Sequence, residues 1–122
     1  MARAKERCER RIDDLGSENI PGAQVYGTMT LTPTGETTVS ELEYTLPSHI
    51  VSFNKENSSY TYQLRIQKQP GTLANSFTFH LQLPEGAKIE SASIPLIGNA
   101  GAWSAQLDLR RDLVIEVNFK LE

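Results

Sequence analysis

The side chains that could do chemistry are few and scattered in this sequence. Its two histidines are His49 and His80, far apart along the chain, and its single cysteine is Cys8. A zinc site needs converging His, Cys, Asp or Glu ligands, and a nucleophile needs a base within hydrogen-bond reach. No spacing of either kind is present. We therefore predict no catalytic residues, no metal site and no cofactor, and expect that the chain is not an enzyme.

Taken one by one, the reactive residues have ordinary structural interpretations. His80 alternates with apolar neighbours, which predicts a solvent-facing position on a strand. Cys8 follows Arg7 and could react as a thiolate, but its place on a sparse apolar stripe is more typical of a small hydrophobic residue. The pair Asp13-Asp14 lacks the alternating oxygen ligands of a calcium loop. Asn57-Ser58-Ser59 matches the N-glycosylation pattern, which is common by chance.

Two aromatic residues are the remaining candidates for ligand binding. Tyr26 falls on the polar side of an alternating segment, so its ring is expected to be exposed. Exposed rings beside amide side chains are a common way to hold sugars. Trp103 is in phase with Ala105, Leu107 and Leu109, which predicts a core position instead. Tyr26 is therefore the single candidate ligand-binding residue.

Composition limits the partners. The 122 residues carry a net charge of −3, and an acidic protein lacks the electrostatic footprint for phosphate backbones, so we expect no nucleic-acid partner. No apolar run approaches the roughly 20 residues of a membrane span, so we expect no membrane insertion by this segment. A lone cysteine cannot form an internal disulfide. A protein or a cell-wall glycan remains a candidate partner, and the sequence leaves the oligomeric state open.

Residues 1–22 differ in kind from the rest. Ala4, Cys8, Ile12 and Leu15 recur at helical spacing among charged residues, which predicts a short amphipathic helix over residues 2–15 that ends at Gly16. Residues 17–22 then form a linker. At the other end, Leu121-Glu122 is consistent with a cloning scar, in which case the chain is a piece excised from a longer protein.

The region from residue 23 to residue 120 has the pattern of an all-β domain. Residues 60–83 contain two strictly alternating segments around Gln69-Pro70-Gly71-Thr72, which predicts a half-buried antiparallel hairpin. Further alternating segments are expected as strands, the first two with a turn at residues 32–35 between them and a bulge near Ser40-Glu41 in the second. These segments cover residues 24–31, 37–46, 50–53, 87–94, 103–109 and 113–119. Seven or eight short strands predict an antiparallel, immunoglobulin-like β-sandwich.

Three segments carry a resemblance to a known family. They are Tyr62 to Thr72 with its Gln-Lys-Gln-Pro-Gly-Thr turn, Phe79 to Gly86 with its Leu-Pro-x-Gly strand end, and Trp103 to Leu113. Residues 40–119 resemble the C-terminal β-domain of an uncharacterised family of membrane-anchored bacterial cell-envelope proteins. The resemblance implies an extracytoplasmic domain of a larger parent. It carries over no functional residues, because that family has no established activity.

These observations favour a non-catalytic structural or interaction module of an extracytoplasmic envelope protein. A carbohydrate-binding β-sandwich module that uses Tyr26 is the alternative. Assembly through exposed sheet edges is a further alternative, since unpaired edges recruit other strands and few inward-pointing charges discourage that here.

Overall fold

The computed structural model describes residues 11–14 and 22–122 of the chain. The described residues form β-strands and one short 3-10 helix, η2 (Ser48–Ile50), so the predicted all-β class is confirmed. The chain divides into two compact units, Met1–Tyr44 and Thr45–Glu122, and each is described by itself below.

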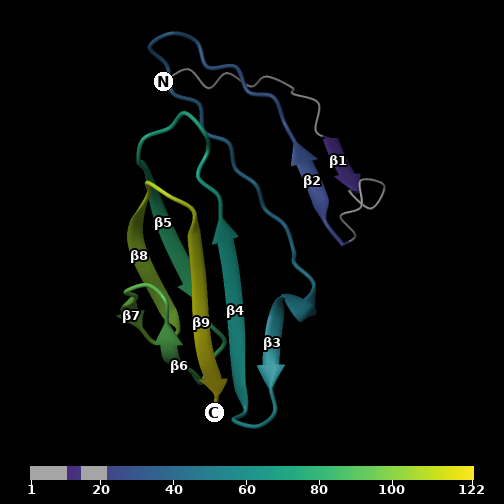
Figure 1. Ribbon diagram of the computed structural model, residues 1–122, viewed down its shortest axis with the longest axis vertical. Helices are drawn as coiled ribbons and strands as arrows, with labels where there is room; N and C mark the ends of the chain where they lie inside the picture. The colour runs from purple at the N-terminus through teal and green to yellow at the C-terminus, as the bar shows by residue number, and fades with distance from the viewer. Residues whose placement is uncertain (1–10, 15–21) are drawn as a thin grey trace. The chain divides into compact units, whose positions relative to one another are not determined.

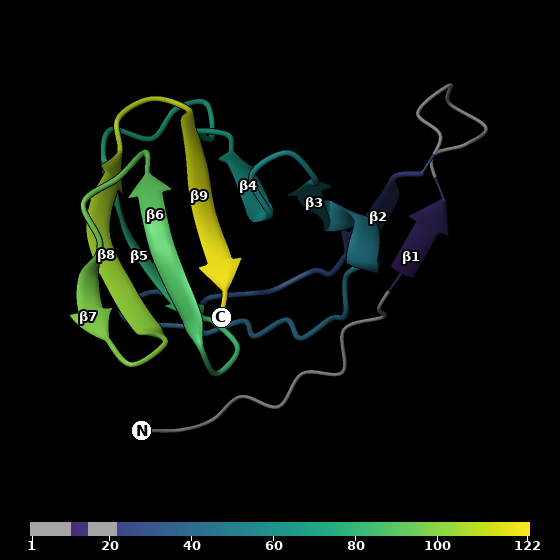
Figure 2. The same ribbon diagram turned by 90° about the horizontal axis from the view of Figure 1, so that it is seen from below.

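The second unit contains two antiparallel sheets. In spatial order, the first sheet consists of β3 (Val51–Asn54), β4 (Ser59–Ile66), β9 (Leu113–Leu121) and β6 (Ala87–Ala92). The second sheet consists of β5 (Asn75–Gln82), β8 (Ala102–Leu109) and β7 (Ile97–Asn99). Figure 2 shows the two sheets as separate layers, with β5, β8 and β7 on one side and β6, β9 and β4 on the other. This arrangement is consistent with the predicted sandwich.

The core of the second unit lies between these layers and centres on β9. Ile115 and Val117 are fully buried, and Phe119 is nearly so. Phe79 of β5, in the other sheet, and Leu83, which directly follows β5, complete the buried cluster. The inward phase predicted for residues 60–66, 77–83 and 113–119 is thereby confirmed. Trp103 also packs against this cluster, as expected.

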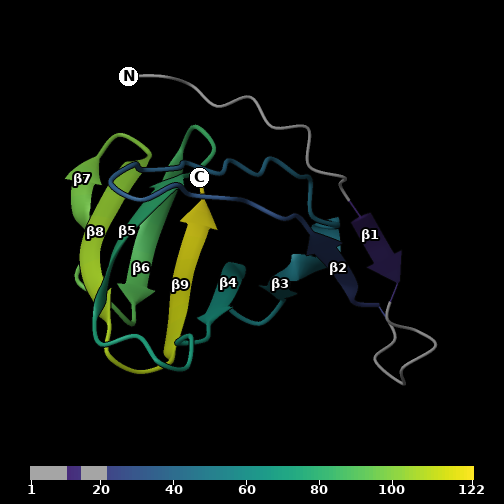
Figure 3. The same cartoon turned by 90° about the horizontal axis from the view of Figure 1, so that it is seen from above.

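The predicted hairpin over residues 60–83 is wrong in its pairing, although its strands and turn are present. Thr72 N donates to Gln69 O at 3.4 Å, so the turn closes. However, β4 pairs with β3 and β9, whereas β5 pairs with β8 in the other sheet. Figure 3 shows β4 beside β9 and β5 beside β8. The turn therefore connects two layers. Two alternating segments with one turn between them satisfy the same apolar pattern in either arrangement, because both bury one face.

The immunoglobulin-like topology is not confirmed. In the constant-type immunoglobulin order, the first sheet holds the first, second, fifth and fourth strands and the second holds the third, sixth and seventh. Here the seventh strand of the unit, β9, lies between the second and the fourth, and the fifth, β7, pairs with the sixth. Figure 1 shows β9 running the length of the unit beside β4. The exchange places the most apolar strand at the centre of the larger sheet and leaves the short, exposed β7 at an edge.

The first unit contains a two-stranded antiparallel sheet. Strand β1 (Arg11–Asp14) pairs with β2 (Gln24–Gly27), with Ile12 opposite Tyr26. The predicted N-terminal helix is therefore wrong over residues 11–14. Residues 2–10 and 15 of that prediction lie outside the described residues, as does Cys8. A helix of this length with so thin an apolar stripe is marginal on its own, whereas pairing with β2 satisfies the backbone of residues 11–14.

Residues 28–44 do not form the predicted strands. Strand β2 ends at Gly27 instead of continuing to residue 31, and residues 37–46 contain neither a strand nor a bulge. The expected turn at residues 32–35 is present, because Glu36 N donates to Pro33 O at 3.1 Å. Exposed hydroxyls join the two sides of the turn, with Thr32 Oγ1 donating to Thr38 Oγ1 at 3.0 Å. These bonds hold a loop without the backbone ladder that defines a strand.

Candidate interaction surface

Tyr26, the predicted ligand-binding residue, stands on the short β1–β2 sheet with 39% of its surface exposed. Strand pairing places it opposite Ile12, which is 67% exposed. Trp103, the second aromatic candidate, lies on β8 of the other unit and packs against the core there. Tyr26 therefore presents one exposed ring opposite an aliphatic neighbour on the paired strand.

The two histidines considered for catalysis or metal binding lie on different elements. His80 is exposed on β5 opposite Ser104, as predicted, while His49 lies in η2 before β3. In the part of the chain that the structure describes, no group of three or more His, Cys, Asp or Glu side chains could hold a metal ion. The same part contains no helix long and apolar enough to cross a bilayer.

The Asn57-Ser58-Ser59 segment has a structural role in the β3–β4 turn. Asn57 Oδ1 accepts hydrogen bonds from Ser59 N at 3.2 Å and from Ser59 Oγ at 2.6 Å. Ser59 is buried at 5% exposure and begins β4, and Ser58 takes a positive φ of 54°. The side chain of Asn57 thereby satisfies polar groups of a buried serine, which accounts for the asparagine at this position without a glycan.

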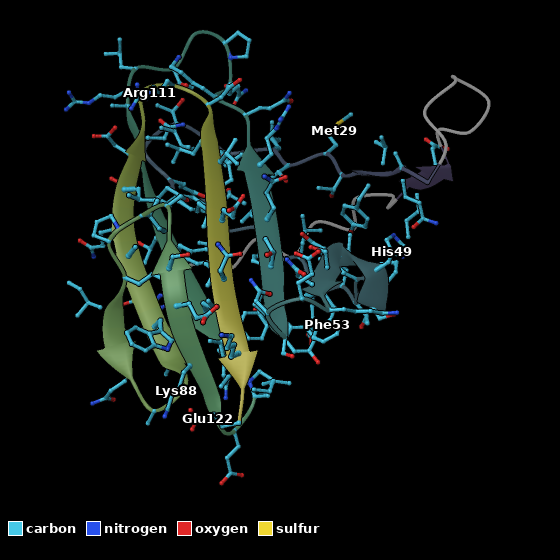
Figure 4. The ribbon with its side chains drawn as sticks, turned by 60° about the horizontal axis from the view of Figure 1, so that its bottom comes forward. Met29, His49, Phe53, Lys88, Arg111 and Glu122 are labelled. Carbon is cyan, nitrogen blue, oxygen red and sulfur yellow. The ribbon has the colours of Figure 1, made fainter. Side chains whose placement is uncertain are left out.

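A shallow groove lies where the chain passes from β8 to β9. Its lining consists of Gln106, Leu107, Asp108, Arg110, Arg111 and Leu113. Arg110 Nε and Asp108 Oδ2 form an ion pair at 3.1 Å, and Asp112 Oδ1 accepts from Lys68 N at 2.7 Å. Both acidic groups at this end thus have partners. The described residues place no carboxylate within ion-pair distance of Arg111, and Figure 4 shows its side chain at the end of the unit opposite Lys88 and Glu122.

The sequence predicted only a tight polar turn at residues 110–112 and missed the groove. Two adjacent arginines between inward-facing leucines could have indicated a groove in the sequence. In such a segment the guanidinium groups lie beside apolar surface. Which residues line the groove depends on the crossing from one sheet to the other, and the sequence did not show that crossing.

A further exposed surface is the segment of residues 22–44, which we call the arm. None of its residues is buried. Its large apolar side chains are exposed by between 39% and 85%, and they are Val25, Tyr26, Met29, Leu31, Val39, Leu42 and Tyr44. In Figure 4 the labelled side chain of Met29 stands away from the ribbon. Large contiguous apolar surfaces are rare on monomeric proteins and are typical of interaction sites.

Comparisons with known proteins give the chain no relatives. No family model, no curated protein and no solved structure matches it.

Proposed function

We propose that this chain is a non-catalytic interaction module and that the arm is its contact surface. The observation that carries the proposal is the contrast in burial within the chain. The second unit buries its alternating apolar side chains between two sheets, whereas the arm leaves seven large apolar side chains exposed. Burying such surface against a partner is favourable, at about 25 cal/mol for each Å² removed from water.

The scatter of reactive groups supports the non-catalytic part of the proposal. General acid–base chemistry requires side chains within hydrogen-bond reach of one another or of a substrate. The two histidines instead occupy two separate elements, η2 and β5. A demonstrated turnover that is lost in His80→Ala would contradict this part.

The resemblance of residues 40–119 to the envelope family supports a location for the module. We infer that it belongs to the extracytoplasmic part of a membrane-anchored parent, where it holds a structural or assembly contact. The resemblance rests on the turn at residues 69–72 and the strand end at residues 83–86, both of which connect elements of the second unit.

Site-specific photocrosslinking tests the proposed surface. A photoreactive phenylalanine analogue replaces Met29 in the arm, which is 77% exposed, and the matched control replaces Glu56 in the exposed β3–β4 turn. Irradiation of cells that make the protein is expected to give discrete crosslinked products from position 29 and none from position 56. Equal yields at the two positions, or no product at position 29, would contradict the proposal.

Carbohydrate binding through Tyr26 is the second candidate, and it is favoured by the exposed ring on β2. Stacking of a sugar on one ring is weak, so the expected affinity is in the millimolar range, about −4 kcal/mol. A titration with cell-wall oligosaccharides, followed by NMR, would shift the Tyr26 ring resonances and leave those of the matched ring Tyr44 unchanged. No shift at Tyr26 at saturating sugar removes this candidate.

A further inference from the structure

We propose that the partner of the arm is a second copy of this chain, and that the arm of one copy binds the groove at residues 106–113 of the other. This inference rests on the proposed function and names its partner. Two surfaces with complementary character lie on the same polypeptide. One is apolar and acidic, and the other is apolar and basic.

The arm is acidic as well as apolar. It carries Glu36, Glu41 and Glu43, and it contains no lysine or arginine. All three glutamates are exposed. Glu41 and Glu43 alternate with two exposed apolar residues, Leu42 and Tyr44. A surface that docks this segment must therefore offer both apolar contact and positive charge.

The groove has those two properties. Leu107 and Leu113 are half-buried in its lining, so part of their surface is available. Arg110 and Arg111 stand at its rim and are exposed. Arg110 already pairs with Asp108, whereas Arg111 has no described carboxylate within ion-pair distance. A guanidinium group can bind a carboxylate through two parallel hydrogen bonds, so Arg111 is positioned to receive Glu41 or Glu43 of a partner.

Complementary surfaces on one chain lead to self-association. When each arm occupies the groove of the other copy, the two contacts are related by a two-fold axis and the assembly closes as a dimer. The contact depends on attraction between the glutamates of the arm and the arginines of the groove. Its affinity should therefore fall as added salt screens these charges. Like charges brought together in the same contact are strongly unfavourable.

A charge-exchange experiment on the full chain tests the inference. One variant carries Arg111→Glu, which leaves an acidic arm and an acidic groove rim. The second carries Glu41→Arg and Glu43→Arg, which leaves a basic arm and a basic rim. Sedimentation velocity of the unaltered chain is expected to show concentration-dependent association. Each variant alone should associate about tenfold or more weakly, and an equimolar mixture should recover the association, since each arm then finds a groove of opposite charge.

Matched controls reproduce the charge changes elsewhere. Lys55→Glu repeats the change of Arg111→Glu, and Glu56→Arg with Glu85→Arg repeats that of the second variant. All three control positions are exposed and lie in turns outside the arm and the groove. These controls should associate like the unaltered chain.

Every other outcome overturns the inference. The inference is overturned if the unaltered chain is monomeric at all concentrations. It is also overturned if the charge variants associate as strongly as the controls. A mixture of the two variants that fails to recover association would show that the arm of one copy does not contact the groove rim of the other. A crosslink from position 29 to a different protein, combined with a monomeric chain, overturns the second copy as partner and leaves the proposed interaction module standing.

Discussion

The arm and strand β9 have similar alternating sequences, but their apolar side chains differ in burial. Residues 25–31 and residues 113–119 both place apolar side chains at alternate positions. In β9 the inward residues Ile115 and Val117 are fully buried, whereas in the arm Met29 and Leu31 are 77% and 67% exposed. Alternation therefore establishes that a segment has an apolar face, and a second observation is needed to know whether anything in the same chain covers it.

Strand pairing accounts for the difference. β9 has hydrogen-bonded neighbours on both sides, β4 and β6, and a second sheet opposite its apolar face. Tyr60 of β4 stacks on Phe119 with ring centroids 5.4 Å apart, and Thr61 and Ser91 on the flanking strands both bond the side chain of Asn118. Beyond Gly27 the arm has no strand neighbour among the described residues. The two regions should consequently respond very differently to matched substitutions.

The largest effect is expected for Ile115→Ala. Ile115 has no exposed surface, and removing a buried isoleucine side chain costs about 2–5 kcal/mol because it loses burial and leaves a cavity. The matched substitution Ile12→Ala, at a residue 67% exposed in β1, should change the free energy of unfolding by less than about 0.5 kcal/mol. Urea unfolding of both variants measures the contrast, and equal losses would show that the first unit has a core of its own.

A glycine pair gives the next largest contrast. Gly98 in β7 has φ 154°, and a Cβ atom there would lie 2.1 Å from Ala102 O and 2.9 Å from Trp103 Cα. Gly98→Ala must move the backbone of β8, and we expect a loss of about 2 kcal/mol or more.

Gly35 in the arm is the control for Gly98. It also has a positive φ, 78°, but nothing lies within 4 Å of a Cβ at that position. Gly35→Ala should strain only the local turn, by about 1 kcal/mol, and should leave the unfolding midpoint of the second unit unchanged. Thermal unfolding followed through Trp103 fluorescence reports on the β7–β8 pair directly. A Gly98→Ala midpoint equal to that of the unaltered chain would contradict the close approach.

A hydrogen-bond pair is expected to give a smaller difference. Asn57→Ala removes the acceptor of both bonds from Ser59, a buried residue, and should cost about 1–2 kcal/mol. Thr38→Ala removes the exposed bond to Thr32 in the arm, where water can replace the lost partner, and should cost less than about 0.5 kcal/mol. Urea unfolding distinguishes the two, and a loss at Thr38 as large as that at Asn57 would mean that the arm unfolds together with the sandwich.

These contrasts show what the sequence could predict. The apolar phase of β4, β5 and β9 was predictable because a period of two fixes which side chains share a face. The partner of each strand was not, because β4 and β5 keep the same phase whether they pair with each other or face each other across the core. The helix over residues 2–15 was predicted from the spacing of Ala4, Cys8, Ile12 and Leu15. Over residues 11–14, pairing with β2 overrode that local preference.

The same reasoning explains the candidate sites. The exposure of Tyr26 and His80 followed from their phase and is observed. The exposed set of the arm could not be anticipated, since its residues match the pattern of buried ones. The groove could not be predicted either, because its lining depends on how the chain crosses from β8 in one sheet to β9 in the other.

A large deletion, of residues 1–44, is expected to have only a small effect on stability. In a chain that begins at Thr45, every pair of hydrogen-bonded strands from β3 to β9 is retained, as is the whole buried cluster. The ion pair between Lys88 and Glu122, at 2.8 Å, and the bond from Glu122 N to Gly86 O are also kept. A unit with its own core is expected to fold alone. Its free energy of unfolding in urea should therefore differ from that of the full chain by less than about 1 kcal/mol.

Self-association should disappear in the same shortened chain, because the arm is gone and the groove is left without its occupant. A shortened chain that fails to fold would show that residues 1–44 form part of the sandwich core, and the contrast between the two regions would then be lost.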